Sequence, residues 1–113
     1  MSSADGRENT AVGAKALMKN DVGVANTAIG NKTLMRNSIG VYNTAVGNAA
    51  LFANDVGGYN TAMGSFAMSS NTSGYSNTAA GDVSLTSNSN GNNNAAFGAA
   101  ALHDNVTGSS NTA

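Results

Sequence analysis

The tripeptide Asn-Thr-Ala recurs along this chain at a constant interval of 17 residues. The first copy starts at Asn9, and every later unit also starts with Asn, although the unit at Asn94 has Ala95 in place of Thr. A disordered low-complexity chain has no physical reason to keep such a register. The repeat is therefore the feature from which the fold is predicted.

Read from its first Asn, the unit is N-T-A-φ-G-x-x-small-L-x-x-N-x-x-G-x-x, where φ is usually apolar. Helical-hairpin repeats need about 30 residues, so a 17-residue unit is too short for one. It suits one turn of a β-solenoid with short strands at positions 2–4 and 7–10. We therefore predict an all-β parallel β-solenoid, or β-roll, over residues 9–113, with six full repeats, a lead-in at residues 1–8 and truncation within a seventh repeat.

Two invariant columns, Asn at position 12 and Gly at position 15, have the residue types of a turn. The Asn side chain can bond its own backbone, and Gly adopts a positive φ without steric cost. Gly at position 5 is expected to do the same at the other corner. Stacked Asn side chains can also hydrogen-bond from turn to turn. The predicted turn residues are Asn20, Gly23, Asn37, Gly40, Asn54, Gly57, Asn71, Gly74, Asn88, Gly91, Asn105 and Gly108.

The dependable large apolar column is position 9, which is predicted to form the core. Its members are Leu17, Leu34, Leu51, Met68, Leu85 and Leu102. Position 4 is expected to face the core as well, together with the Thr of position 2. The invariant Ala of position 3 then faces outward, against a neighbouring chain.

Apolar content is low, because Leu, Ile, Val and Phe together number 18 of 113 residues. One such chain cannot offset its ordering entropy alone. The sequence has no Cys and no Asp column for calcium, so we expect no disulfide, metal or cofactor. The remaining way to stabilise the roll is another chain, and we predict a homotrimer joined through the Ala column. On this prediction Ala45→Glu would abolish both trimer and fold.

The Asn-Thr-Ala-Val-Gly and Asn-Thr-Ala-Ile-Gly segments, with the small-Leu pair that follows, resemble two groups of proteins. One is the trimeric β-roll head repeats of autotransporter adhesins. The other group, whose motif is closer to this one, consists of the repeats of phage tail-fibre-like proteins that often precede an endosialidase-type chaperone domain. The resemblance covers residues 9–113 and departs from the adhesin heads in its period and in Thr where Val is usual. It implies a parallel trimeric rod on a virion or cell surface.

Residues for catalysis are scarce. The single His, His103, stands in a variable column and is expected to be exposed. The acids, among them Asp21, Asp55 and Asp104, show no paired spacing of the kind that glycoside hydrolysis needs. We therefore predict that the chain is not an enzyme. No apolar run is long enough to span a membrane, and residues 1–7 have no signal-peptide core.

All five cations precede residue 37 and would form a basic band at one end of the rod. The band can attract an anionic glycan, lipopolysaccharide or nucleic acid, or it can be a solvated face whose Lys residues discourage edge pairing. Tyr42 and Tyr59 share a column, where they can bind sugar faces or pack from turn to turn. The candidate anion or glycan contacts are Lys15, Lys19, Lys32, Arg36, Tyr42 and Tyr59.

The function predicted from these features is a structural and adhesive fibre module, serving as a spacer or a receptor-binding head. Its expected partners are two further copies, end-to-end neighbours and a cell-surface glycan or receptor, with no nucleic acid and no membrane insertion. One alternative is a self-assembling extracellular filament. A minor alternative is an ice- or surface-binding solenoid, suggested by the Thr column but opposed by the expectation that Thr points inward.

Overall fold

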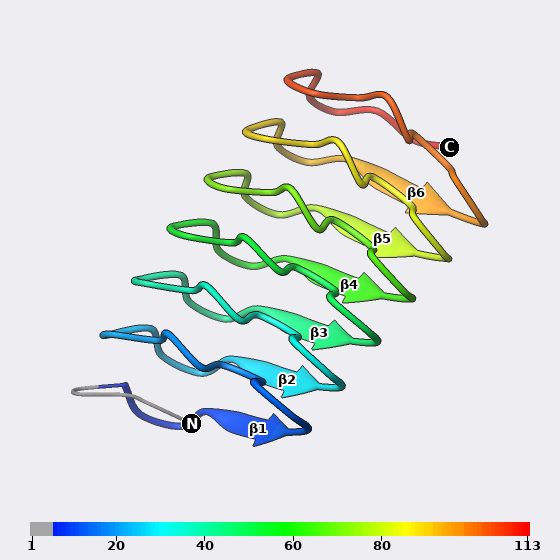
Figure 1. Ribbon diagram of the computed structural model, residues 1–113. Helices are drawn as coiled ribbons and strands as arrows, with labels where there is room; N and C mark the ends of the chain where they lie inside the picture. The colour runs from blue at the N-terminus through cyan, green and yellow to red at the C-terminus, as the bar shows by residue number, and fades with distance from the viewer. Residues whose placement is uncertain (1–5) are drawn as a thin grey trace.

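The structure, a computed structural model, describes residues 6–113. Six three-residue strands form one parallel sheet in chain order (Figure 1). The strands are β1 (Thr10–Val12), β2 (Thr27–Ile29), β3 (Thr44–Val46), β4 (Thr61–Met63), β5 (Thr78–Ala80) and β6 (Ala95–Phe97). Residues 1–5, which make up most of the predicted lead-in, lie outside the described residues.

Each strand pairs with the strand 17 residues later, in register. Thr27 of β2 aligns with Thr44 of β3, and Ala28 aligns with Ala45. The turns are stacked into a rod whose dimensions are 36 × 21 × 16 Å (Figure 1). The predicted parallel β-solenoid with a 17-residue turn is confirmed, and the described residues contain no helix.

The stack already includes residues that precede the first Asn. The backbone N–H of Ala25 donates to the carbonyl of Arg7 at 3.0 Å. One turn later Tyr42 N–H makes the same bond to Val24 O, also at 3.0 Å. Arg7 and Glu8 therefore occupy positions 16 and 17 of a turn below β1.

The return half of each turn, positions 6–13, lies across the core from the strands. The prediction of a second strand at positions 7–10 is wrong, because two residues in each return segment have a left-handed backbone. Lys15 has φ 61° and Leu17 has φ 48°, and the following units repeat this pattern. Left-handed residues interrupt the extended conformation that a strand requires. The return segments still bond from turn to turn, as Leu17 N–H does to Thr33 O at 3.0 Å.

The position 9 column forms the core, as predicted. Leu17, Leu34, Leu51, Met68 and Leu85 are fully buried, and Leu102 is half-buried. They pack against the small residues of position 8 and against the Ala column of the strands. That Ala column, consisting of Ala28, Ala45, Ala62, Ala79 and Ala96, is also fully buried.

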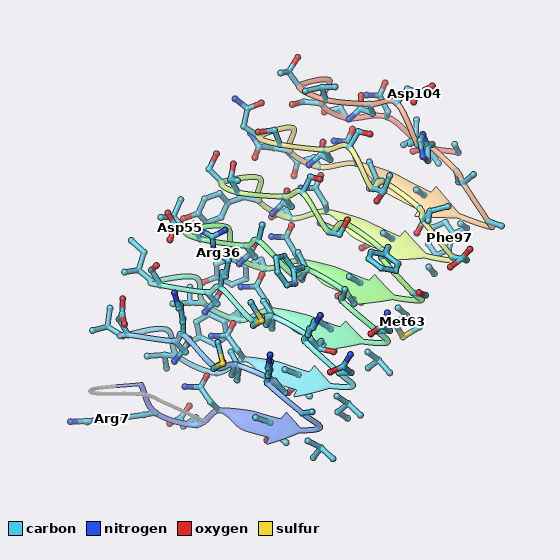
Figure 2. The ribbon with its side chains drawn as sticks, in the orientation of Figure 1. Arg7, Arg36, Asp55, Met63, Phe97 and Asp104 are labelled. Atoms are coloured by element: carbon cyan, nitrogen blue, oxygen red, sulfur yellow. The ribbon has the colours of Figure 1, made fainter. Side chains whose placement is uncertain are left out.

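The predicted orientation of the strands is therefore wrong. Ala of position 3 faces inward, and the apolar residue of position 4 faces the surface, as Met63 and Phe97 do in Figure 2. The space between the strands and the return segments is already occupied by the Leu column, so only a methyl group fits on the strand side. The Thr of position 2 shares the outward face with position 4, so the expectation that Thr points inward is wrong as well.

The two columns require Gly for different physical reasons. Gly47, at position 5, has φ 134°, and an added Cβ would lie 2.5 Å from the carbonyl oxygen of Gly64 in the next turn. Gly57, at position 15, does not have a positive φ, so that part of the prediction is wrong. An added Cβ there would meet Asn54 Oδ1 and, at 2.6 Å, the carbonyl oxygen of Gly74. Position 15 must be Gly because the turns approach one another too closely for a side chain.

Candidate functional site

The interior of the roll is half polar. Besides the Leu and Ala columns, it contains two buried columns of Asn, one at position 1 and one at position 12. Of the position 1 column, Asn26, Asn43, Asn60, Asn77 and Asn94 are buried, and of the position 12 column, Asn20, Asn37, Asn54, Asn71 and Asn88 are buried. Every buried side-chain nitrogen and oxygen in residues 6–113 has a hydrogen-bond partner.

The position 12 column makes two kinds of bond. Asn54 Nδ2 donates to Asn37 Oδ1 of the preceding turn at 2.8 Å. It also donates to the carbonyl of Gly57, three residues later in its own turn, at 2.8 Å. The predicted turn bond and the predicted Asn ladder are both confirmed at this position.

The position 1 column joins the same network from the other side. Asn43 Nδ2 donates to the carbonyl of Gly57 at 2.8 Å, so one carbonyl accepts from both columns. The backbone N–H of Asn43 donates to Asn26 Oδ1 at 3.0 Å. Among the predicted turn residues this column was missed. The sequence signal for it was that position 1 is Asn in every repeat, because a surface position that only needs to be polar would vary among polar residues.

The surface formed by the return segments, opposite the strands, carries a hollow that we call the return-side groove. Its larger part has a volume of about 670 Å³ and its smaller part about 380 Å³. The larger part is lined by Asn31, Lys32, Asn48, Ala49, Phe52, Ala53, Phe66, Ser69, Ser70 and Thr72. The smaller part is lined by Lys19, Arg36, Ser38, Ala53, Asp55 and Thr72. The two parts share Ala53 and Thr72 in their linings and are therefore adjacent.

The groove lies where the third repeat has Ala in two columns that hold larger residues in a neighbouring repeat. Ala49 stands at position 7, between Lys32 one turn below and Phe66 one turn above. Ala53 stands at position 11, one turn above Arg36. Ala49 is buried at the floor, whereas Phe66 is 45% exposed at the wall. The repeat thus gives a regular surface, and the small side chains of Ala49 and Ala53 leave a depression in it.

The structure brings three of the six candidate contacts to this groove. Lys32 lines the larger part, and Lys19 and Arg36 line the smaller part together with Asp55. Lys19 and Arg36 are paired through their backbones on adjacent turns. Figure 2 shows Arg36 and Asp55 on the same side of the rod. Lys15 shares the column of Lys32 but does not line the groove.

The two tyrosines lie elsewhere, on the turn that follows the return segment. Their rings stack from one turn to the next, with centroids 5.0 Å apart and planes 14° apart. Both remain exposed. Tyr75, one column earlier, donates its hydroxyl to Val56 O at 2.9 Å. Tyr42 and Tyr59 therefore do not share a site with the groove cations.

Groups of the kind used in catalysis or metal binding are dispersed in the described part of the chain. His103 is exposed, as predicted, and its Nδ1 lies 2.8 Å from the carboxylate of its neighbour Asp104. Residues 6–113 contain no group of three or more His, Asp or Glu side chains that could hold a metal ion. No helix in the same residues has the length and apolarity to cross a membrane.

Comparisons with protein-family models, with curated proteins and with solved structures found no match.

Proposed function

We propose that this chain is a non-enzymatic structural and adhesive fibre module that assembles as a parallel homotrimer on a virion or cell surface. The observation that carries the proposal is the apolar column on the outward face of the sheet. Val12 is 57% exposed, Met63 is 49% exposed and Phe97 is 62% exposed. With Ile29, Val46 and the smaller Ala80, which lies between Met63 and Phe97, they form a column up the rod with one residue per turn.

A continuous exposed apolar column is unusual for a monomer and typical of an interface. The broad side of the rod measures 36 by 21 Å, about 750 Å². A stable protein interface buries roughly 800 Å² on each partner, so the contact would have to use nearly the whole of one side of the rod. This face replaces the Ala column, which the chain uses for its own core, as the proposed contact between copies.

Threefold symmetry suits this face. Three parallel rods can direct their position 4 columns toward one axis, so that each turn lies level with its counterparts. Val46 of each chain then packs beside the same residue of the other two. Cyclic closure also protects the apolar columns from lateral aggregation.

Light scattering tests the assembly. The parent chain is expected at three times its 11.1 kDa mass. Val46→Glu, on the outward face, should give a folded monomer, because the charge is exposed in the monomer and buried in the trimer. Asn90→Glu, an exposed substitution away from the strands, is the matched control and should stay trimeric. A folded parent monomer at micromolar concentration, or a trimeric Val46→Glu, would contradict the proposal.

Ala45→Glu does not test the trimer. Ala45 is fully buried within its own chain, so this substitution unfolds the monomer whatever the assembly. Long fibrils of the parent chain in electron micrographs would favour the filament instead.

A second candidate function has gained an observation in its favour. The Thr column faces outward, with Thr10 and Thr44 exposed and Thr27, Thr61 and Thr78 half-buried. It forms a regular row of hydroxyl groups beside the apolar column, one per turn at about 4.8 Å spacing. Such a row can order water or bind a crystal surface. Thermal hysteresis that disappears in Thr44→Lys would favour an ice-binding solenoid over the fibre module.

A further inference from the structure

The return-side groove has a shape and a lining that the fibre role alone does not explain. We propose that it binds an acidic polysaccharide whose sugar units carry carboxylate groups, laid along the rod axis. The proposal rests on the adhesive part of the proposed function and specifies where the ligand binds and what its chemistry is.

The lining of the groove spans several repeats. Its two parts adjoin at Ala53 and Thr72 and together extend over residues from the first to the fourth repeat. An open, elongated hollow accommodates a stretch of polymer better than it encloses a compact small molecule.

The larger part of the groove combines apolar groups with neutral polar groups. Phe66 is 45% exposed, and Phe52 is half-buried beside it in the lining. Ring faces of this kind pack against the C–H face of a sugar ring, since both surfaces lose water there. Amide and hydroxyl groups from Asn48 and Ser69 line the same space and can bond sugar hydroxyls.

The lining of the groove is positively charged. Lys32, Lys19 and Arg36 line the groove against a single acid, Asp55. The lining therefore has a net charge of +2, although the whole chain has a formal charge of −1. A planar guanidinium binds carboxylates in a fork geometry, which favours a carboxylated ligand.

The same observations disfavour an acidic peptide and a nucleic acid. A peptide that adds as a strand needs free backbone groups, but Ala49 N–H is already bonded to Asn31 O and Phe66 N–H to Asn48 O, both at 2.9 Å. A nucleic-acid site commonly neutralises about 6–10 phosphates, and this groove offers three cations.

The test uses the full chain and isothermal titration with a short oligogalacturonate. Its methyl ester is the uncharged probe of the same sugar. Polyglutamate and single-stranded oligothymidine are the probes for the two competing polymer classes. The expected result is binding of the oligogalacturonate, with affinity at least about tenfold weaker for each of the other three probes.

Two matched pairs of variants locate the site. Ala49→Leu fills the groove floor and should weaken binding about tenfold, whereas Ala100→Leu, at the same repeat position and with φ 58° against 56°, should change it less than about twofold. Lys32→Gln should weaken binding several-fold. Lys15→Gln removes the same charge from the same column outside the groove and should leave the affinity unchanged.

Several results would overturn the proposal. They are no binding of the oligogalacturonate, equal binding of polyglutamate or oligothymidine, or equal losses in the members of either pair. Light scattering on the same samples distinguishes failure of the groove proposal from failure of the trimer proposal. Ala49→Leu leaves the strand face intact and should stay trimeric. A trimer that does not bind the sugar refutes the groove alone, and a monomer that binds it refutes the trimer alone.

Discussion

Asn54 donates its side-chain amide to the carbonyl of Gly57 at 2.8 Å, and its side-chain oxygen occupies the place that a side chain on Gly57 would take. The invariance of one column therefore explains the invariance of the other. The Asn side chain closes the turn and links it to the turn below. Gly leaves the space in which it does so.

Gly57→Ala should destabilise the fold by about 3 kcal/mol, from a clash and a displaced hydrogen bond. The added Cβ meets Asn54 Oδ1 and, at 2.7 Å, Asn71 Nδ2, and both atoms are fixed by the ladder. Gly58→Ala is the control and should cost less, since position 16 holds larger residues such as Val41 in other repeats, and its Cβ meets the exposed ring of Tyr75 at 2.8 Å and only one backbone atom, Val41 O, at 3.2 Å. Denaturant unfolding measures both, and equal losses would refute the role assigned to position 15.

A second pair separates backbone strain from stacking. Gly47 and Gly98 both have a positive φ, of 134° and 116°. An added Cβ on Gly98 has no atom within 4 Å, whereas one on Gly47 meets the carbonyl oxygen of Gly64. Gly98→Ala should cost about 1 kcal/mol of strain. Gly47→Ala should cost about 3 kcal/mol, because it also collides with Gly64. The difference in unfolding free energy is the measurement, and a difference near zero would show that φ alone fixes position 5.

The Asn ladder should be intolerant of charge. Asn54→Asp removes both donors and places a carboxylate against Asn37 Oδ1, so the loss should reach about 3 kcal/mol or more. Asn48→Asp, an exposed Asn whose side-chain oxygen accepts from Asn31 at 3.0 Å, keeps its acceptor and should change stability by less than about 0.5 kcal/mol. Melting temperatures at neutral pH compare the two. A tolerated Asn54→Asp would mean that the ladder contributes little to stability.

The inward direction of the Ala column is testable with the smallest change in size. Ala45→Val should cost about 1–3 kcal/mol through overpacking of the core. Ala80→Val, at the outward position 4 of β5, should be neutral within about 0.5 kcal/mol. If the two effects were reversed in an unfolding titration, the assignment of the two faces would be wrong.

Folding should not depend on calcium. The buried side-chain nitrogen and oxygen atoms of residues 6–113 all have partners within the chain, so none requires a cation. Circular dichroism should give the same spectrum with and without chelator. A spectrum that collapses in chelator would reveal a metal site that the geometry does not contain.

The sequence was sufficient for the period, the parallel register, the Leu core and the turn bond of Asn20, because each depends on invariant spacing. The face of the strand was predicted wrongly because alternation separates Ala28 from Ile29 but does not state which side is the interior. Larger apolar residues were assigned to the core. The observed interior is filled by Leu34 from the return segment, so the strand contributes only a methyl group.

The return segment was missed for a related reason. Leu51 has φ 49°, a conformation that sequence patterns reserve for Gly and Asn. Only the packed structure shows that burial of Leu51 stabilises this backbone. The groove could not be predicted either. Nothing in the sequence distinguishes Ala49 and Ala53 from other Ala residues, and the depression appears only when the side chains of adjacent turns are packed around them.

The Asn ladders have a further consequence for the symmetry of the rod. Backbone bonds run both ways along the axis, as Thr27 N–H donates to Asn43 O above it and Gly30 N–H to Val12 O below it. The side-chain bonds from Asn54 to Asn37 and from Asn43 to Asn26, like their equivalents further along the two ladders, point from the later turn to the earlier one. The amide dipoles are therefore aligned along the core, and each polarises the next. The rod thus has an electrical polarity as well as a chain direction, and two rods placed end to end continue it only head to tail.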